Sequence, residues 1–123
     1  MTINQKIIET LTPHCSVVAP DFYDGAAETY IVFNKYSDRA ADHGDSRPVA
    51  DVVFVHVHLF APSNQNILDL IAQIRMALLT AGFSWPEVEH GADKDCQHII
   101  FDTEIEDDEI MQLVNEKFNN ERK

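Results

Sequence analysis

The sequence predicts an α+β fold, in which an antiparallel or mixed sheet of four to five strands carries helices mainly on one face. Three observations lead to this prediction. Residues 28–37 and 49–61 alternate between apolar and other side chains, which is the period of a half-buried strand. Apolar residues recur at helical spacing near both chain ends and in the middle. The resulting order, α-β-β-β-α-β-β-α, is typical of a layered α+β domain.

The first helix is expected over residues 3–12. Thr2 and Gln5 match a capping box at its start, and Pro13 ends it. One stripe of this helix is apolar and consists of Ile3, Ile7 and Leu11. A brief extended segment and a turn at 24–25 follow.

The first long strand is expected over residues 28–37. Its two faces alternate, with Tyr30, Val32, Asn34 and Tyr36 on one side and Ile31, Phe33 and Lys35 on the other. The polar stretch after it, residues 37–48, has neither a helical nor a strand period. We therefore expect a mobile hairpin tip there, which is either a functional loop or a tolerated surface insertion.

The next strand, residues 49–61, has two faces of different character. Its aliphatic face consists of Val53, Val55, Val57 and Leu59, and its opposite face of Val52, Phe54, His56, His58 and Phe60. We expect a helix to cover the aliphatic face and the opposite face to be only partly covered.

The longest helix is expected over residues 64–81, introduced by Pro62 and ended by Gly82. Its apolar stripe consists of Ile67, Leu70, Ile71, Ile74, Leu78 and Ala81. Residues 83–89, which contain Pro86, read as an edge strand.

The last strand is expected over residues 96–105 and the last helix over 106–123. In the strand, Gln97, Ile99, Phe101 and Thr103 lie opposite to His98, Ile100 and Asp102. Acidic residues at 107–109 suit the start of the helix, and we expect its buried stripe to consist of Ile110, Leu113, Val114 and Phe118. The 123 residues then make one domain, a core of 1–105 plus this helix.

Composition narrows the possible functions. The formal net charge of −12 repels phosphates, which argues against sequence-specific nucleic-acid binding. No apolar run approaches the length of a membrane span, and the N-terminus does not resemble a secretion signal, so we expect a cytosolic product without a membrane partner. Cys15 and Cys96 are expected to be two separate thiols.

Motifs for catalysis are missing from the sequence. None of the serines lies in a Gly-x-Ser-x-Gly elbow, and the four glycines form no phosphate-binding loop. We therefore expect no catalytic residue and no cofactor. One alternative stays open: His56, His58 and His98 could converge on a zinc ion if their strands were neighbours.

Exposed rings are the remaining candidate for a functional surface. If the face opposite to the aliphatic one is free of helices, its aromatic and charged side chains form a patch for contact with another protein. The alternative is that the edge segments and the last helix cover these side chains. The candidate interface residues are Tyr30, Tyr36, Arg39, Phe54, His56, His58 and Phe60. Trp85 adds further aromatic surface.

The succession of segments resembles the small tail terminator proteins of long-tailed bacteriophages, also called tail completion or tail-to-head joining proteins. "ETYIVFNKYSD" precedes a polar stretch, and "VADVVFVHVHLFAP", "ILDLIAQIRMALLTAGF" and "CQHIIFDTEI" follow in order. The features that match are the strand at 29–33, the alternating valines of the next strand, the helix end at 81–83 and the strand at 98–101. The resemblance covers about residues 1–105, by order and texture, and the C-terminal helix departs from the family pattern.

This resemblance implies a structural subunit of a phage or prophage virion. Such subunits assemble as a hexameric ring on the major tail tube protein, stop its polymerisation and offer a docking surface to a head-completion or neck protein. DNA passes through the ring without being read. The expected location is the head-proximal end of the tail, after assembly in the host cytoplasm. The alternatives are a small metal- or ligand-binding domain that uses the three histidines, and a head–tail neck or connector protein.

Overall fold

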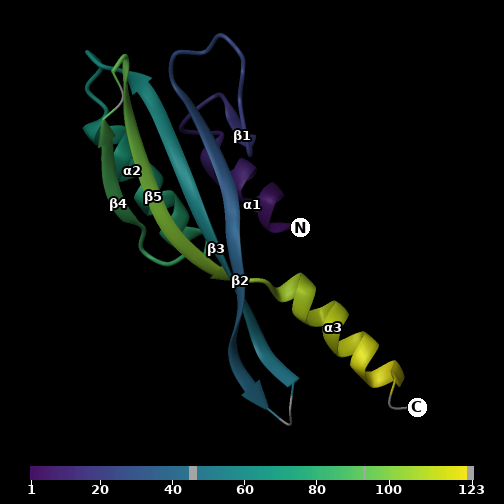
Figure 1. Ribbon diagram of the computed structural model, residues 1–123. Coiled ribbons are helices and arrows are strands. Elements are labelled where there is room, and N and C mark those ends of the chain that lie inside the picture. Colours follow the sequence, from purple (N-terminus) through teal and green to yellow (C-terminus); the bar gives the residue numbers. More distant parts are fainter. Residues whose placement is uncertain (45–46, 93, 122–123) are drawn as a thin grey trace.

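The computed structural model describes residues 1–44, 47–92 and 94–121, and in them it confirms the predicted order of helices and strands. The sheet has the strand order β1-β2-β3-β5-β4 (Figure 1). The strands are β1 (Val18–Pro20), β2 (Tyr30–Gly44), β3 (Arg47–Pro62), β4 (Glu87–Ala92) and β5 (Cys96–Glu106). Because β1 lies parallel to β2 and the other neighbours pair antiparallel, the sheet is mixed.

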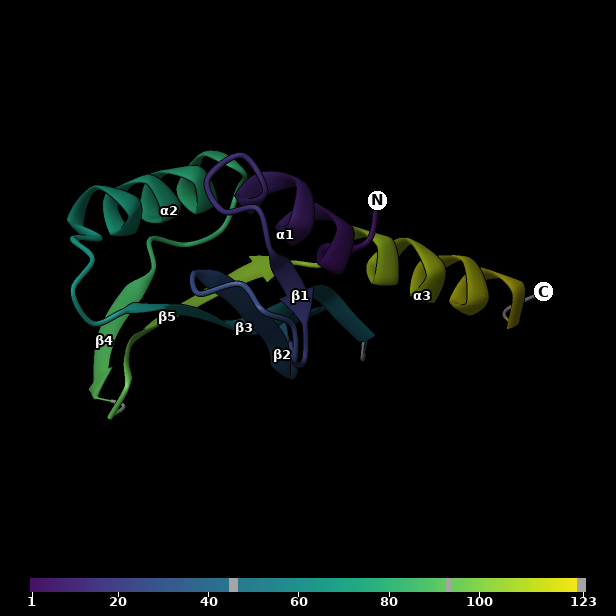
Figure 2. The same cartoon turned by 90° about the horizontal axis from the view of Figure 1, so that it is seen from above.

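Two helices, α1 (Ile3–Leu11) and α2 (Leu68–Thr80), lie on the same face of the sheet (Figure 2). The aliphatic face of β3 lies under them and is at most 1% exposed, as the alternation predicts. The other main contributors to this core are Ile7, Leu11, Ile31, Phe33, Ile74, Leu78, Phe83, Ile99 and Phe101. The opposite face, which we call the outer face, carries none of the three helices that the described residues form (Figure 2).

The start of α1 is the predicted capping box. The Gln5 backbone N–H donates to the Thr2 hydroxyl at 3.1 Å, and the Thr2 backbone N–H donates to the Gln5 side chain at 2.9 Å. Together these bonds satisfy two donors that a helix start otherwise leaves unpaired.

The helix α2 begins at Leu68, four residues later than the predicted start at 64. Residues 63 and 64 form a turn, and the Asn66 side chain accepts from the Leu68 backbone N–H at 3.1 Å. Pro62 therefore introduces a capping loop rather than the first turn of the helix. The predicted apolar stripe is correct, since Ile67, Ile74 and Leu78 are buried.

The end of α2 is a Schellman motif centred on Gly82. The Phe83 N–H donates to the Leu78 carbonyl at 3.0 Å, and the Gly82 N–H donates to the Leu79 carbonyl at 3.1 Å. Gly82 has a φ of 102°, a conformation that other residues adopt only with strain.

Replacing Gly82 by alanine should lower the free energy of unfolding by about 1 kcal/mol, because a Cβ disfavours this backbone conformation. The added methyl group has room, since its nearest neighbours would be 3.9 Å away. Urea denaturation of the purified protein measures the change. Unchanged stability would mean that the helix end relaxes without cost.

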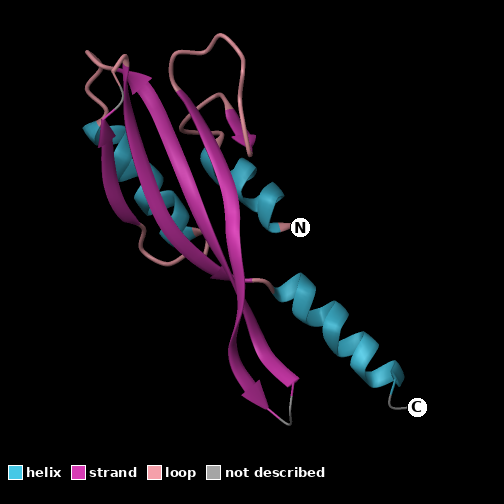
Figure 3. Cartoon of the chain, in the orientation of Figure 1, coloured by secondary structure: helices cyan, strands magenta, loops and turns pink. Residues whose placement is uncertain are grey.

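The predicted hairpin tip at 37–48 is wrong in its extent. Strand β2 continues to Gly44 and β3 begins at Arg47, so the two strands pair through most of that stretch as a ribbon (Figure 3). The register shifts at Lys35/Ser37, Ala40/Asp42 and Asp42/His43. These bulges interrupt the two-residue period and explain why the sequence shows no strand pattern there. Residues 45 and 46 lie outside the described residues.

Two further predictions need correction. The edge strand is confirmed as β4, but it spans Glu87–Ala92, and residues 83–86 lie outside it. The last helix, α3 (Asp108–Glu121), buries none of its residues, so its predicted buried stripe is wrong. Ile110 is 40% and Leu113 is 52% exposed, because α3 projects away from the sheet (Figure 1).

Several polar contacts fix the start of the α3 helix. The Asp107 backbone N–H donates to the Asp51 carbonyl at 2.8 Å, and the Asp107 side chain accepts from the Ile110 N–H at 3.0 Å. The N-terminal ammonium lies 3.3 Å from the Glu109 carboxylate, where both groups are about half exposed. None of the helices in the described ranges is long and apolar enough to span a membrane.

Candidate functional site

A continuous row of rings crosses the outer face, and we call it the aromatic row. It consists of Tyr23, Tyr30, Phe60, His98, His58, His56, Tyr36 and Phe54, in this order of contact. The strand pairing creates it, because directly opposed residues of neighbouring strands point to the same side of a sheet. Four of these rings come from β2 and β5 or from the loop before β2, and four from alternate positions of β3.

The upper half of the row joins three strands and a loop. The rings of Tyr23 and Tyr30 have centroids 4.8 Å apart, and Tyr30 stacks on Phe60 at 4.9 Å. Phe60 in turn stacks on His98 at 4.3 Å, and His98 lies 5.1 Å from His58. Such separations fall in the range of favourable ring pairs.

The lower half continues along β3. His58 meets His56 edge-on at 5.9 Å, His56 stacks on Tyr36 at 4.1 Å, and Tyr36 lies 6.0 Å from Phe54. The Arg39 guanidinium lies over the Phe54 ring at 5.0 Å, a cation–π contact that ends the row.

A bulge in β2 brings Arg39 to this face. Lys35 is opposite Val55, but Ser37 is opposite Phe54, so Tyr36 is the extra residue. After it Ser37 and Arg39, opposite Phe54 and Val52, point to the outer face. The Arg39 Nε therefore lies 3.3 Å from the Ser37 hydroxyl and donates to it.

All seven candidate interface residues of the sequence analysis therefore lie on one face. The fold brings these seven residues together on one surface. Their role as an interface stays a prediction. Tyr23 could not be predicted to lie on this face, because it comes from a loop without periodicity. The Tyr23 hydroxyl accepts from the Ala27 N–H at 3.0 Å, and Gly25 lies so close under the ring that a Cβ would overlap it.

A histidine pair forms the centre of the row. His58 Nδ1 and His98 Nε2 are 2.9 Å apart, a hydrogen bond in which one nitrogen donates and the other accepts. The accepting ring must be neutral. Burial, followed by the nearby His98 and His56, lowers the pKa of His58, which keeps this half-buried ring uncharged.

Asp102 links the lower rings. The Tyr36 hydroxyl donates to its carboxylate at 2.9 Å, and His56 Nε2 lies 3.8 Å from the same oxygen. Burial and the Asp102 carboxylate raise the pKa of the Tyr36 phenol, so Tyr36 is a donor at neutral pH.

The three histidines do not form a metal site as they stand. Within the ranges that the structure describes, no three side chains of His, Cys, Asp or Glu are grouped to hold a metal ion. The two closest imidazole nitrogens point at each other, and His56 stacks on Tyr36 instead of joining them. A zinc site would require these rings to turn, and it stays an alternative prediction.

Carboxylates gather beside the row, on the outer face of β4 and β5. Register places five acidic residues there: Glu87, Glu89, Asp102, Glu104 and Glu106. The outer face is therefore divided into an aromatic and histidine-rich part on β2 and β3 and an acidic part on β4 and β5.

Trp85 lies outside the aromatic row. It precedes β4 and is 48% exposed, with the Arg75 guanidinium 4.5 Å from its ring centroid. Arg75 is fixed by two hydrogen bonds to the Pro86 carbonyl, at 2.8 and 3.2 Å. With Tyr36 and Phe54, Trp85 lines a hollow of about 270 Å³ at the edge of the row.

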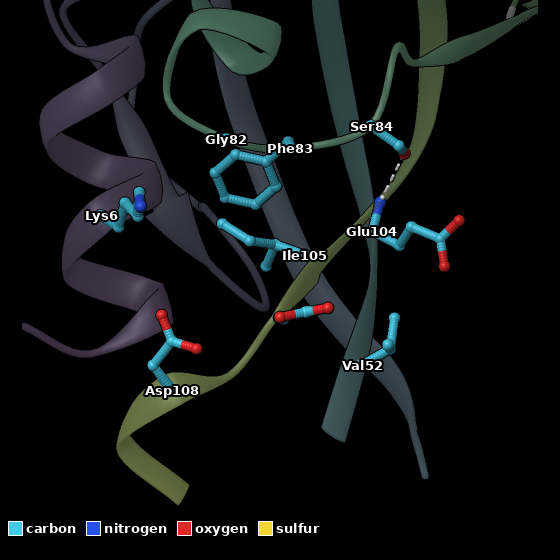
Figure 4. Close-up of a pocket in the computed structure, with 9 residues that line it drawn as sticks. Lys6, Val52, Gly82, Phe83, Ser84, Glu104, Ile105 and Asp108 are labelled. Carbon is cyan, nitrogen blue, oxygen red and sulfur yellow. Dashed lines mark hydrogen bonds between the residues drawn. The ribbon is translucent and has the colours of Figure 1, made fainter. Parts of the chain in front are cut away.

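A second hollow of about 540 Å³ lies where α3 leaves the sheet (Figure 4). Ser84 lines this hollow, but its hydroxyl takes part in hydrogen bonds with β5. The hydroxyl lies 3.0 Å from the Thr103 hydroxyl and accepts from the Glu104 N–H at 3.0 Å. Lys6 and Asp108 lie at its rim (Figure 4). The aromatic row is therefore the stronger candidate for function.

Comparison with known proteins adds no identification. No protein-family model matches the chain, and no curated protein is similar to it in sequence.

Proposed function

We propose that this chain is a structural virion protein, a tail terminator that forms a ring on the tail tube of a phage or prophage, stops the growth of the tube and offers a docking surface to the head. The observation that carries the proposal is the aromatic row on a sheet face that no helix of the described chain covers. The resemblance of the sequence to tail terminators is the reason for proposing a phage tail as the assembly in which this surface makes contact.

The composition of the aromatic row supports a contact with protein. Cores of protein–protein interfaces are rich in Tyr, Phe and Arg and poor in Lys, Glu and Asp. The row contains three Tyr and two Phe rings beside its three histidines, with Arg39 at one end. Asp102 contacts Tyr36, and the other carboxylates lie to one side. We assign this face to the major tail tube protein, which a terminator has to recognise.

The acidic part of the outer face supports passage of DNA without binding. Its five carboxylates are part of the net charge of −12, and they repel the phosphate backbone. A ring with such charges lets DNA slide through its channel instead of gripping it.

The mass of the oligomer in solution tests whether the protein forms a ring. Native mass spectrometry across a concentration series should show a metal-free oligomer with the mass of six copies, with or without added tail tube protein. A zinc-loaded monomer would favour the metal-binding alternative. Binding to a head-completion protein but not to tail tubes would favour a neck or connector protein.

A double variant tests the assigned surface. Phe54→Ala with Phe60→Ala removes two half-buried rings of the row, and co-sedimentation with assembled tail tubes should fall at least about tenfold. Leu68→Ala with Met76→Ala is the matched control, because these side chains are 72% and 53% exposed on α2, which lies on the opposite face of the sheet (Figure 2). Equal binding of all three proteins would remove the row from the contact.

A further inference from the structure

The two edges of the sheet are open. Strand β4 forms one edge and pairs only with β5 among the described strands, and β2 forms most of the other edge (Figure 1). Three-residue β1 covers β2 only at 31–33. From Asn34 onward β2 therefore offers unpaired backbone groups, which is the kind of edge that adds a further strand.

The backbone directions show where such a strand would begin. The Ile31 N–H donates to the Val17 carbonyl at 2.9 Å, and the Phe33 carbonyl accepts from the Asp21 N–H at 2.8 Å. Backbone groups alternate in direction along a strand, so those of Lys35 are the next to face this edge. The open stretch starts directly beyond the end of β1.

The two edges carry opposite charge. The β4 edge has Glu87 and Glu89, both exposed, with no lysine or arginine within the strand. The β2 edge has Lys35 and Arg39, both exposed, against Asp38. Arg39, Glu87 and Glu89 also share the outer face, so a sheet continued from one copy to the next would place these charges side by side.

We propose that β4 of one copy adds to the open edge of β2 in a second copy, next to β1, and that this pairing joins the subunits of the ring. The inference rests on the proposed ring and names its contact. A rotation about an axis along the strands preserves their directions, and β4 runs opposite to β2. The new pair is therefore antiparallel, the more stable kind of ladder.

The charges also select this contact over its alternatives. Two β4 edges brought together would place four glutamates side by side, and like charges in a contact are strongly unfavourable. Pairing of unlike edges is heterologous, and such an interface closes into a ring when the rotation between copies allows. The same charges protect the free edge from indiscriminate pairing.

Exchange of the charges tests the inference. One variant carries Glu87→Lys and Glu89→Lys, and the other carries Lys35→Glu and Arg39→Glu. Each variant alone should require an at least about 10-fold higher concentration to assemble, since it brings like charges together. Mixed in equal amounts they should assemble again, because the two kinds of edge then alternate with matched charges. The control for the first variant, Glu9→Lys with Glu121→Lys, makes the same change in net charge at exposed sites away from both edges.

Native mass spectrometry and circular dichroism read the outcome. Loss of assembly in each folded variant with recovery in the mixture supports the pairing. Unchanged assembly of either variant, or failure of the mixture to recover, overturns it while the ring itself stands. A wild-type protein that stays monomeric at every concentration, with and without tail tubes, overturns the proposed ring and this inference with it.

Discussion

Replacing Phe101 by alanine should lower the free energy of unfolding by about 3–5 kcal/mol. Phe101 is fully buried in β5, opposite Val57 of β3 on one side and Val88 of β4 on the other. Removal of the ring therefore leaves a cavity beneath the helices that the surrounding strands cannot close without breaking their pairing. Equilibrium denaturation in urea, followed by circular dichroism, measures the loss.

The control for this prediction is the same substitution at a site without burial. Phe22 is 71% exposed in the loop after β1, so Phe22→Ala should change stability by no more than about 0.5 kcal/mol. A loss below about 1 kcal/mol for Phe101→Ala would mean that the core between β3 and β5 is packed much less tightly than the structure indicates.

Acidification from pH 7 to pH 5 should destabilise the wild type more than a His58→Phe variant. Burial first, and then His98 and His56, lower the pKa of His58 below its ordinary value of 6.5. The native state therefore binds fewer protons than the unfolded chain as the pH falls through 6.5. This contribution to stability is complete above that pH and is lost below it, down to the lowered pKa of the folded protein.

Phenylalanine keeps a ring at position 58 for contact with Phe60 but cannot take up a proton. Urea denaturation at pH 7, 6 and 5 should therefore give a shallower pH dependence for this variant. His90→Phe serves as the control, because it makes the same substitution at an exposed site on the edge strand β4. If the free energy of unfolding changes with pH equally in the wild type and in His58→Phe, protonation of His58 does not contribute to the pH dependence of stability.

The elements of the core could be predicted from the sequence because their periods are local. The valines of β3 alternate without interruption, and the stripe of α2 recurs at helical spacing up to Gly82. Each of these patterns lies within a single strand or helix. The apolar side of β3 and the apolar stripe of α2 are therefore expected to be buried against each other. The fold class was predictable for the same reason.

The arrangement of the candidate site depends on pairing between distant segments. Tyr36, His56 and Asp102 come together only because β3 lies between β2 and β5, and strand order is not encoded in any one strand. The sequence predicted which residues share a face of β2 and of β3, but not that His98 would meet His58. The bulge at Tyr36 could not be predicted either, because it interrupts the two-residue alternation from which a strand is recognised.

The last helix was misjudged for a different reason. Ile110 and Leu113 recur at helical spacing, which predicts a helix correctly, but periodicity does not say whether a partner surface lies within the same chain. The helices α1 and α2 cover one face of the sheet, and α3 projects to the side of the sheet instead of lying over the outer face (Figure 2).

An uncovered helix also works as a gauge of association. With 14 residues and none of them buried, α3 has a length at which helices in water are only marginally stable by themselves. Its coil fraction should consequently fall when another molecule lies against it. Amide exchange within 108–121 then tests whether α3 takes part in an assembly, without any label attached to the chain.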